Sequence, residues 1–188
     1  MSHKYDIGFF SSADRGLDCL LDMIPKIEEQ LGRKVKSCWA YGWNTFDGVH
    51  SKNPEMMKWK WNVIRKMNAV GMDDKGRLSH EDLARLMKDT KVWAYPTEFT
   101  EIHCITALKA QEAGCIPVVT GVAALKETVR RGNVINSANI YTDQNAQKDF
   151  IAKCILALNN HPLLIDAGEV HNRYWPDVAK VWGDALSN

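Results

Sequence analysis

The strongest constraint in this sequence is a repeated alternation of short apolar segments with segments of amphipathic helical spacing. Such alternation favours a parallel sheet, because the helix between two parallel strands covers one face of the sheet. We therefore predict an α/β fold with a parallel sheet and helices on both faces. The expected strands are 5–12, 34–43, 91–96 and 116–120, with weak strand signals at 134–142. The expected helices are 17–32, 56–67, 79–90, 104–113, 125–132 and 143–161, with a last one from near Pro176.

Breaks in this pattern concern one proline and two polar stretches. Pro25 falls inside the apolar stripe of the first helix and predicts a kink or a break, because proline lacks the backbone N–H. Residues 44–55 are polar and turn-rich, which predicts a loop, and 71–77 read as a turn. The length suits a single domain, 1–188, in which 44–70 is the best place for an insertion.

Composition excludes several classes of protein. The formal net charge of +1 gives no support for a polyanion binder at the level of the whole chain. No apolar run reaches the ~18–20 residues of a membrane helix, and Asp6 interrupts the region where a secretion signal needs apolar residues. Five cysteines without CxxC spacing indicate reduced, buried thiols in a cytoplasmic protein, and the six histidines show no metal-binding spacing.

The first strand-to-helix junction that is a candidate binding site is FFSSADRG (9–16). Small hydroxyl residues and a glycine precede the helix there. Free amides at a helix N-terminus attract anions, and Arg15 adds a formal charge. A cradle for a diphosphate is one interpretation. Ordinary helix capping by serine or aspartate is the other.

The second junction is YPTEFTEIHCITALKAQEAGCIPVV (95–119), where Glu98 and Glu101 precede a helix. Ionised carboxylates accept strong hydrogen bonds and suit sugar hydroxyls, while the amides of Cys104, Ile105 and Thr106 face an anion. The alternative is that both glutamates merely complement the helix dipole.

This second segment resembles the signature of the family-four retaining glycosyltransferases, which have the GT-B architecture of two Rossmann-like domains facing across a cleft. Their pattern is a Pro-Ser/Thr turn, two glutamates eight positions apart, and a Gly-x-Pro-Val-Val strand. Four other segments agree in order with that family: 9–27, 76–96, 121–135 and 172–182. The resemblance implies a Rossmann-like half-domain of a GT-B enzyme, its donor-binding half.

Residue by residue, the resemblance implies contacts with a nucleotide-diphospho-sugar donor and no separate cofactor. Arg15 and Gly16 match the Lys-Gly turn that contacts the diphosphate, Ser12 lies near the phosphate-binding arginine of the family, and Arg77 and Leu78 lie where the nucleobase is held.

At the helix after the second junction, the resemblance places the donor sugar and its diphosphate. Glu101 matches the glutamate that contacts the donor sugar. His103 lies beside it, and its imidazole either assists the reaction or has a packing or capping role. Cys104, Ile105 and Thr106 supply diphosphate contacts.

Two departures from that family bear on function. The second glutamate, which holds the ribose, is replaced by Lys109, which has donors only; Glu112 is three residues away. The chain also has about half the length of the family's enzymes and lacks their acceptor half. Either it is an excised domain, or a compact protein works with a partner chain or as a homodimer that supplies this half. The acceptor itself is unknown.

Two other functions compete with retaining glycosyl transfer. A non-catalytic module that binds a nucleotide or a partner protein fits Lys109 and the missing half. A sugar transferase acting on modified DNA fits the basic segment 56–67, in which Lys58, Lys60, Arg65 and Lys66 are interleaved with tryptophans. The same segment reads more simply as an amphipathic helix, so nucleic acid is not favoured.

Overall fold

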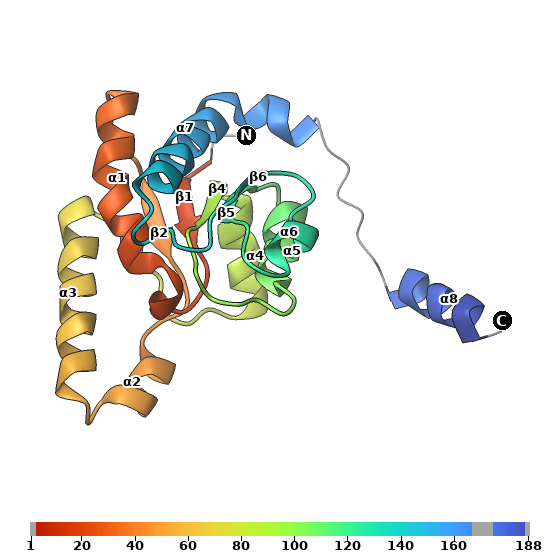
Figure 1. The fold of residues 1–188 in the computed structure, drawn as a ribbon, viewed down its shortest axis with the longest axis horizontal. Coiled ribbons are helices and arrows are strands. Elements are labelled where there is room, and N and C mark those ends of the chain that lie inside the picture. Colours follow the sequence, from red (N-terminus) through yellow and green to blue (C-terminus); the bar gives the residue numbers. More distant parts are fainter. Residues whose placement is uncertain (1–2, 167–174, 187–188) are drawn as a thin grey trace.

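The computed structural model describes residues 3–166 and 175–186, and its core is one six-stranded sheet in which all pairings are parallel (Figure 1). The strand order β3-β2-β1-β4-β5-β6 is that of Rossmann-like folds. The order in which successive strands are added reverses between β1 and β4, although these two strands are parallel. The strands are β1 (Tyr5–Phe9), β2 (Ser37–Trp39), β3 (Asp73–Asp74), β4 (Thr90–Tyr95), β5 (Ile116–Thr120) and β6 (Asn133–Ile135).

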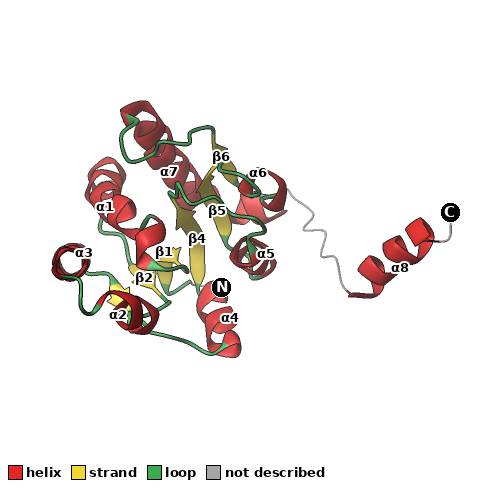
Figure 2. Cartoon of the chain, turned by 60° about the horizontal axis from the view of Figure 1, so that its bottom comes forward, coloured by secondary structure: helices red, strands yellow, loops and turns green. Residues whose placement is uncertain are grey.

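Helices cover both faces of the sheet, which confirms the predicted layers. Helices α1, α3 and α7 lie on one face and α4, α5 and α6 on the other (Figure 2). The helices are η1 (Ala13–Arg15), α1 (Leu17–Leu31), α2 (Asn44–His50), α3 (Pro54–Val70), α4 (His80–Lys88), α5 (Ile105–Glu112), α6 (Leu125–Thr128), α7 (Gln144–Asp166) and α8 (Trp175–Leu186).

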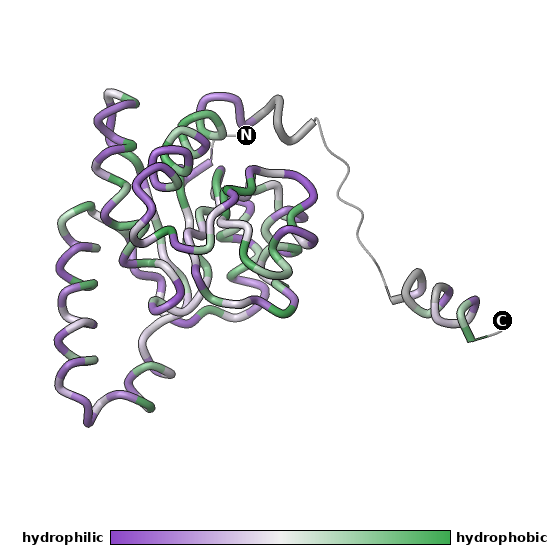
Figure 3. The backbone as a smooth tube through the Cα atoms, in the orientation of Figure 1, coloured by the Kyte–Doolittle hydropathy of each residue, from purple (hydrophilic) through white to green (hydrophobic). Residues whose placement is uncertain are grey.

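Burial on both faces explains why the central strands read as continuous apolar runs. Ile7 and Phe9 of β1 and Val92 and Trp93 of β4 are completely buried. Along α1 and α3, hydrophilic and hydrophobic residues are interspersed, as expected for helices that bury one face (Figure 3). Helix α3 packs against α1.

Helix α1 corrects the expectation of a break at Pro25, because it continues without interruption through this residue. Proline has no N–H to donate to the carbonyl of Leu21, four residues earlier, and α1 forms in spite of this missing hydrogen bond. Buried residues such as Leu20, Leu21 and Ile27 on both sides of the proline hold the helix on the sheet.

The prediction of a loop at 44–55 is wrong in its first half, which forms α2. Phe46 is buried and contacts the rings of Trp43 and Trp59, so tertiary packing stabilises a helix that its polar residues and glycine disfavour. The predicted turn at 71–77 contains the short strand β3, and the predicted strands 34–43 and 134–142 shrink to β2 and β6. That 44–70 is an insertion stays a prediction.

All five cysteines are unpaired and buried, in agreement with the predicted reduced thiols. Burial raises the pKa of the Cys104 thiol to about 11 and those of Cys19 and Cys38 to about 12. Among the described helices, none is both long and apolar enough to cross a bilayer.

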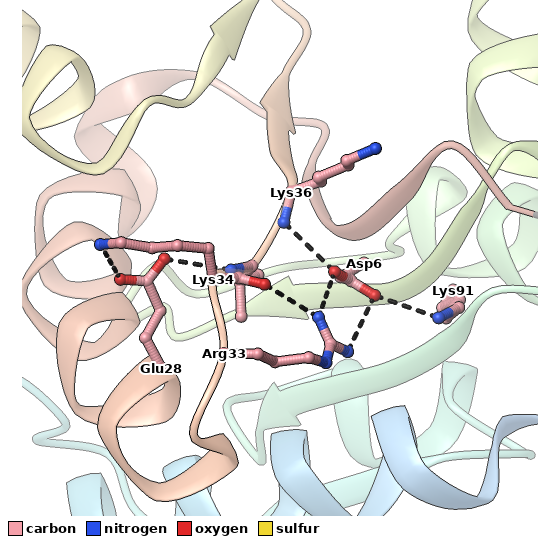
Figure 4. Close-up of polar contacts among 7 residues, drawn as sticks. Asp6, Glu28, Arg33, Lys34, Lys36 and Lys91 are labelled. Carbon is pink, nitrogen blue, oxygen red and sulfur yellow. Dashed lines mark hydrogen bonds and ion pairs between the residues drawn. The ribbon is translucent and has the colours of Figure 1, made fainter.

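A buried carboxylate joins three strands at the amino-terminal edge of the sheet (Figure 4). Asp6 of β1 accepts hydrogen bonds from Arg33 Nη1 and Nη2 at 2.8 and 3.2 Å, from Lys91 Nζ at 3.1 Å and from the Lys36 amide at 3.2 Å. Burial raises its pKa, but these hydrogen bonds outweigh burial and leave the pKa below its ordinary value. The charged form of Asp6 therefore stabilises the fold.

We expect Asp6→Asn to lower the free energy of unfolding at neutral pH by about 2 kcal/mol. Because the pKa of Asp6 is lower in the folded state than in the unfolded state, its contribution is present above the unfolded pKa and is lost as pH falls through the folded pKa. The difference between the two proteins, measured by urea denaturation, should therefore narrow from about pH 5 towards about pH 2. The matched control is Asp149→Asn, an exposed carboxylate on α7, which should have little effect at any pH. A difference that does not change with pH would contradict this assignment.

Candidate functional site

The candidate site lies at the carboxyl-terminal edge of the sheet, on both sides of the point between β1 and β4 where the strand order reverses. Because all six strands are parallel, the loops that follow β1, β2, β3, β4 and β5 meet at this edge. These loops contain most of the residues that the sequence predicts to bind the donor. The others lie on α5, which begins at the same edge.

Close backbone contact holds the loop after β1 against the loop after β4. Gly16 has a φ of 120°, and a Cβ on it would lie 2.2 Å from the carbonyl oxygen of Pro96. A side chain at this position would therefore require the loops to separate. Glycine lets the preceding residue, Arg15, reach the loop that contains Glu101.

The carboxylate of Glu101 is the polar centre of the site. The residue is 9% exposed, and its Oε1 accepts a hydrogen bond from the Tyr95 hydroxyl at 2.7 Å and one from Arg15 Nη1 at 3.5 Å. No described residue donates to Oε2. Burial, followed by the bond to Glu101, raises the pKa of Tyr95, so its hydroxyl stays protonated and continues to donate.

Arg15 is held by an aromatic ring as well as by this carboxylate. Its guanidinium carbon lies 3.8 Å from the ring centroid of Phe99, and its side chain is about one third exposed. Stacking on Phe99 fixes the plane of the guanidinium and leaves N–H groups directed elsewhere. Sequence analysis missed Phe99 because an aromatic residue in a loop gives no motif by itself.

The loops after β2 and β3 make a second close contact at this edge. A Cβ on Gly42, whose φ is 77°, would lie 3.0 Å from the Arg77 amide nitrogen. The Arg77 guanidinium lies 4.9 Å from the Tyr41 ring centroid, and Leu78 packs against the core. The residues nominated for the nucleobase are thus gathered beside the loop that contains Tyr41.

The start of α5 presents the remaining candidates, which differ in exposure. Cys104 is the buried N-cap residue, whereas His103 and Ile105 are exposed and Thr106 is half-buried. Lys109 is exposed one turn further along α5. Ser12 is half-buried, and its carbonyl accepts the amide of Arg15 at 3.0 Å.

Glu98, the other carboxylate of this junction, is used elsewhere in the fold. Its Oε1 accepts a hydrogen bond from the backbone amide of Tyr141 at 2.9 Å. Two buried threonines support the same loop, because the Thr97 amide donates to Thr120 Oγ1 at 2.9 Å and that hydroxyl donates to the Thr97 carbonyl.

The basic segment 56–67 lies in α3, and two of its four cations, Lys60 and Lys66, form ion pairs within the fold. Lys60 is buried and contacts both carboxylate oxygens of Asp47 at 2.6 and 2.8 Å. Lys66 pairs with Asp18 and Asp22 of α1. This agrees with the simpler interpretation of an amphipathic helix packed on the fold.

Comparison with known proteins shows what the fold is similar to. No protein-family model and no curated protein sequence matches the chain. Among solved structures, the chain is similar to the pneumococcal O-GlcNAc transferase GtfA in complex with UDP and GlcNAc, with a TM-score of 0.62, 11% identity, and coverage of 99% of this chain and 36% of that one. It is also similar to sucrose-phosphate synthase from Thermosynechococcus elongatus, with a TM-score of 0.62, 18% identity, and coverage of 100% and 46%.

A third similar structure is Anabaena HepE in complex with UDP, with a TM-score of 0.59, 15% identity, and coverage of 98% and 49%. The fold is therefore the Rossmann-like fold of a GT-B half-domain, as the sequence resemblance implied. The chain spans between about a third and a half of the length of these structures.

We expect Gly16→Ala to lower the free energy of unfolding by at least about 3 kcal/mol, from the positive φ and the clash with Pro96 together. Gly32→Ala is the matched control, because Gly32 also has a positive φ, of 65°, but no heavy atom lies within 4 Å of the place that its Cβ would occupy. It should cost about 1 kcal/mol. Urea denaturation of both variants measures the difference, and equal losses would show that the contact with Pro96 contributes nothing.

Replacing Tyr95 by phenylalanine removes the hydroxyl that donates to Glu101 at 2.7 Å. We expect a loss of about 1.5 kcal/mol in the free energy of unfolding, since the donor serves a buried charged acceptor. Tyr141→Phe is the control, because no described residue bonds to that hydroxyl. Similar stabilities for Tyr95→Phe and the wild type would contradict the role of this bond.

Proposed function

We propose that this chain is the donor-binding half of a glycosyltransferase that uses a UDP-sugar and retains anomeric configuration. The proposal is supported by the GT-B half-domain fold and by GtfA and HepE, which are similar in fold and were solved with UDP. Retention rests on the sequence resemblance alone. The main supporting observation is the ion pair between Arg15 and Glu101, which lies at the carboxyl-terminal ends of β1 and β4, where the strand order reverses.

Glu101 is suited to hold the donor sugar. Tyr95 and Arg15 both use its Oε1, so Oε2 remains as an acceptor for sugar hydroxyls. The buried environment strengthens such hydrogen bonds relative to water. In this proposal, exposed His103 lies at the sugar end of the site and assists as a proton donor or acceptor.

Arg15 is suited to hold the diphosphate and to stabilise the charge that develops on it as the glycosidic bond breaks. The contact with Glu101 occupies one of its five N–H donors, and the planar guanidinium matches phosphate oxygens. Ser12 and Gly16 on its loop, and the amides of Cys104, Ile105 and Thr106 at the start of α5, complete the proposed diphosphate site.

The nucleoside is assigned to the neighbouring loops. Arg77 and Leu78, beside Tyr41, face the nucleobase in this proposal, and Lys109 donates to the ribose or to phosphate in place of a carboxylate. The acceptor half comes from a partner chain or a second copy. A module that binds the nucleotide without transferring sugar is the second candidate, favoured by Lys109.

The test is titration calorimetry of the full chain with UDP and with a panel of UDP-sugars. We expect Arg15→Ala to weaken UDP binding by about tenfold, because one charge-assisted contact is lost. Glu101→Ala should leave UDP affinity within about twofold and remove the preference for UDP-sugars over UDP. Arg65→Ala, at an exposed position on α3, is the control and should change neither affinity.

Turnover separates the two candidates. A glycosyltransferase releases UDP from the preferred UDP-sugar in the presence of acceptor, and the anomeric configuration of the product tests retention. Binding without any release of UDP, measured with both the acceptor and the acceptor half supplied, would favour the non-catalytic module. If Arg15→Ala and Arg65→Ala bind UDP equally well, the proposed diphosphate site is wrong.

A further inference from the structure

The loop between β4 and α5, residues 96–104, carries two groups that contact the guanidinium of Arg15. One is the ring of Phe99, whose centroid lies 3.8 Å from the guanidinium carbon, and the other is the carboxylate of Glu101, 3.5 Å from Nη1. The separation of these two groups depends on the conformation of the loop. The contacts that fix the loop therefore determine the geometry of the proposed donor site.

The first of these contacts takes over where the pairing of β4 with β5 ends. That pairing stops at Tyr95, and Pro96 has no N–H with which to extend it. Beyond the proline, one side chain of β5 bonds to both backbone groups of Thr97. The Thr97 amide donates to Thr120 Oγ1 at 2.9 Å, and the Thr120 hydroxyl donates to the Thr97 carbonyl. Both threonines are completely buried, so water does not compete for these bonds.

The side chain of Thr97 in turn holds the backbone at Phe99. Its hydroxyl oxygen accepts a hydrogen bond from the Phe99 amide at 3.0 Å, which forms a local turn of the kind that serine and threonine favour. The ring that stacks on Arg15 is thus connected to the end of β5 through two threonine side chains, those of Thr97 and Thr120.

The loop after β5 also holds Glu101 directly, through a strained turn. The amide of Ala124 donates to the Glu101 carbonyl at 3.1 Å. The preceding residue, Ala123, has a φ of 46° and is the one non-glycine residue with a positive φ in the described part of the chain. This conformation costs an alanine about 1 kcal/mol, and such strain is concentrated at functional sites, where surrounding contacts maintain it.

From these contacts we infer that Thr120 is a positioning residue of the donor site, which fixes the loop that carries Phe99 and Glu101. The inference rests on the proposed function, in which Glu101 holds the sugar and Arg15 the diphosphate. Thr120 is completely buried, so it acts through Thr97 and does not touch the donor itself. Without its hydroxyl the donor would have to order the loop on binding, and that ordering costs affinity.

Titration calorimetry of the full chain with UDP and with its preferred UDP-sugar tests this inference. Thr120→Val keeps the shape of the side chain but removes both hydrogen bonds to Thr97, and we expect it to reduce the preference for the UDP-sugar over UDP by about fivefold. Thr120→Ser keeps the hydroxyl and should restore the preference to within about twofold of the wild type.

A matched control separates positioning from stability. Thr90→Val removes a hydrogen bond of the same kind, from a completely buried threonine hydroxyl to the carbonyl of Leu86, at the opposite edge of the sheet. Urea denaturation should show a loss of stability for both valine variants, because each leaves a buried carbonyl without this donor. Only Thr120→Val should change the preference for the UDP-sugar.

A milder variant decides the matter where Thr120→Val does not fold. Thr97→Val keeps the backbone bonds to Thr120 and removes only the acceptor of the Phe99 amide. It should reduce the same preference by about threefold.

Three outcomes would overturn the inference, and they separate it from the proposed function. If both Thr120→Val and Thr97→Val keep the preference of the wild type while Glu101→Ala loses it, Thr120 does not position the site and the proposed function stands. If Thr90→Val lowers the preference as much as Thr120→Val does, the effect comes from stability alone. If the wild-type chain binds neither UDP nor any UDP-sugar, the proposed function fails and this inference fails with it.

Discussion

The candidate site depends on the backbone contact between Gly16 and Pro96. Because β1 and β4 are parallel neighbours, their carboxyl ends lie side by side, but this pairing does not decide how closely the loops after them approach. A residue without Cβ allows the loop after β1 to touch the carbonyl of Pro96, and the side chain of Arg15 then reaches the buried carboxylate of Glu101. The fold supplies the edge, and one glycine brings the two charges together.

The buried carboxylates at the two edges of the sheet differ in how many hydrogen bonds they accept. At the amino-terminal edge, Asp6 receives four hydrogen bonds from Arg33, Lys91 and the Lys36 amide, so its charge is fully used in holding strands together. At the carboxyl-terminal edge, Glu101 receives two bonds on one oxygen, the longer of them at 3.5 Å. Glu101 thus keeps an acceptor oxygen without a hydrogen bond, and Arg15 keeps N–H groups that do not bond to this carboxylate. Such unused groups are typical of sites that bind a polar ligand, whereas a structural ion pair usually uses all of them.

Sequence reasoning predicted the layers of this fold because their cause is local and repeated. Buried parallel strands must be apolar and covering helices must be amphipathic, so the pattern of the chain determines the architecture. The resemblance to the glycosyltransferase signature assigned Arg15 and Glu101 to the same donor, and the structure brings them together at one edge of the sheet. Sequence reasoning missed helix α2 because the packing of Phe46 against the rings of Trp43 and Trp59 stabilises it. No local sequence pattern reveals these contacts. Tyr95 and Phe99 were missed for a related reason, since their roles come from contacts across a turn.

The surroundings of Glu101 bear on how much of a transfer reaction this chain can perform. The carboxylate is buried, yet Ile102 next to it is 93% exposed, and Phe99 and Ile105 are exposed as well. Under the proposed function, these residues surround the place where the sugar meets its acceptor, and the described part of the chain does not cover it. Groups that hold a donor need only the edge of this sheet, whereas orienting an acceptor against the sugar needs a second surface. Under the proposed function, donor binding and sugar transfer are therefore separable properties, and the first requires only this chain.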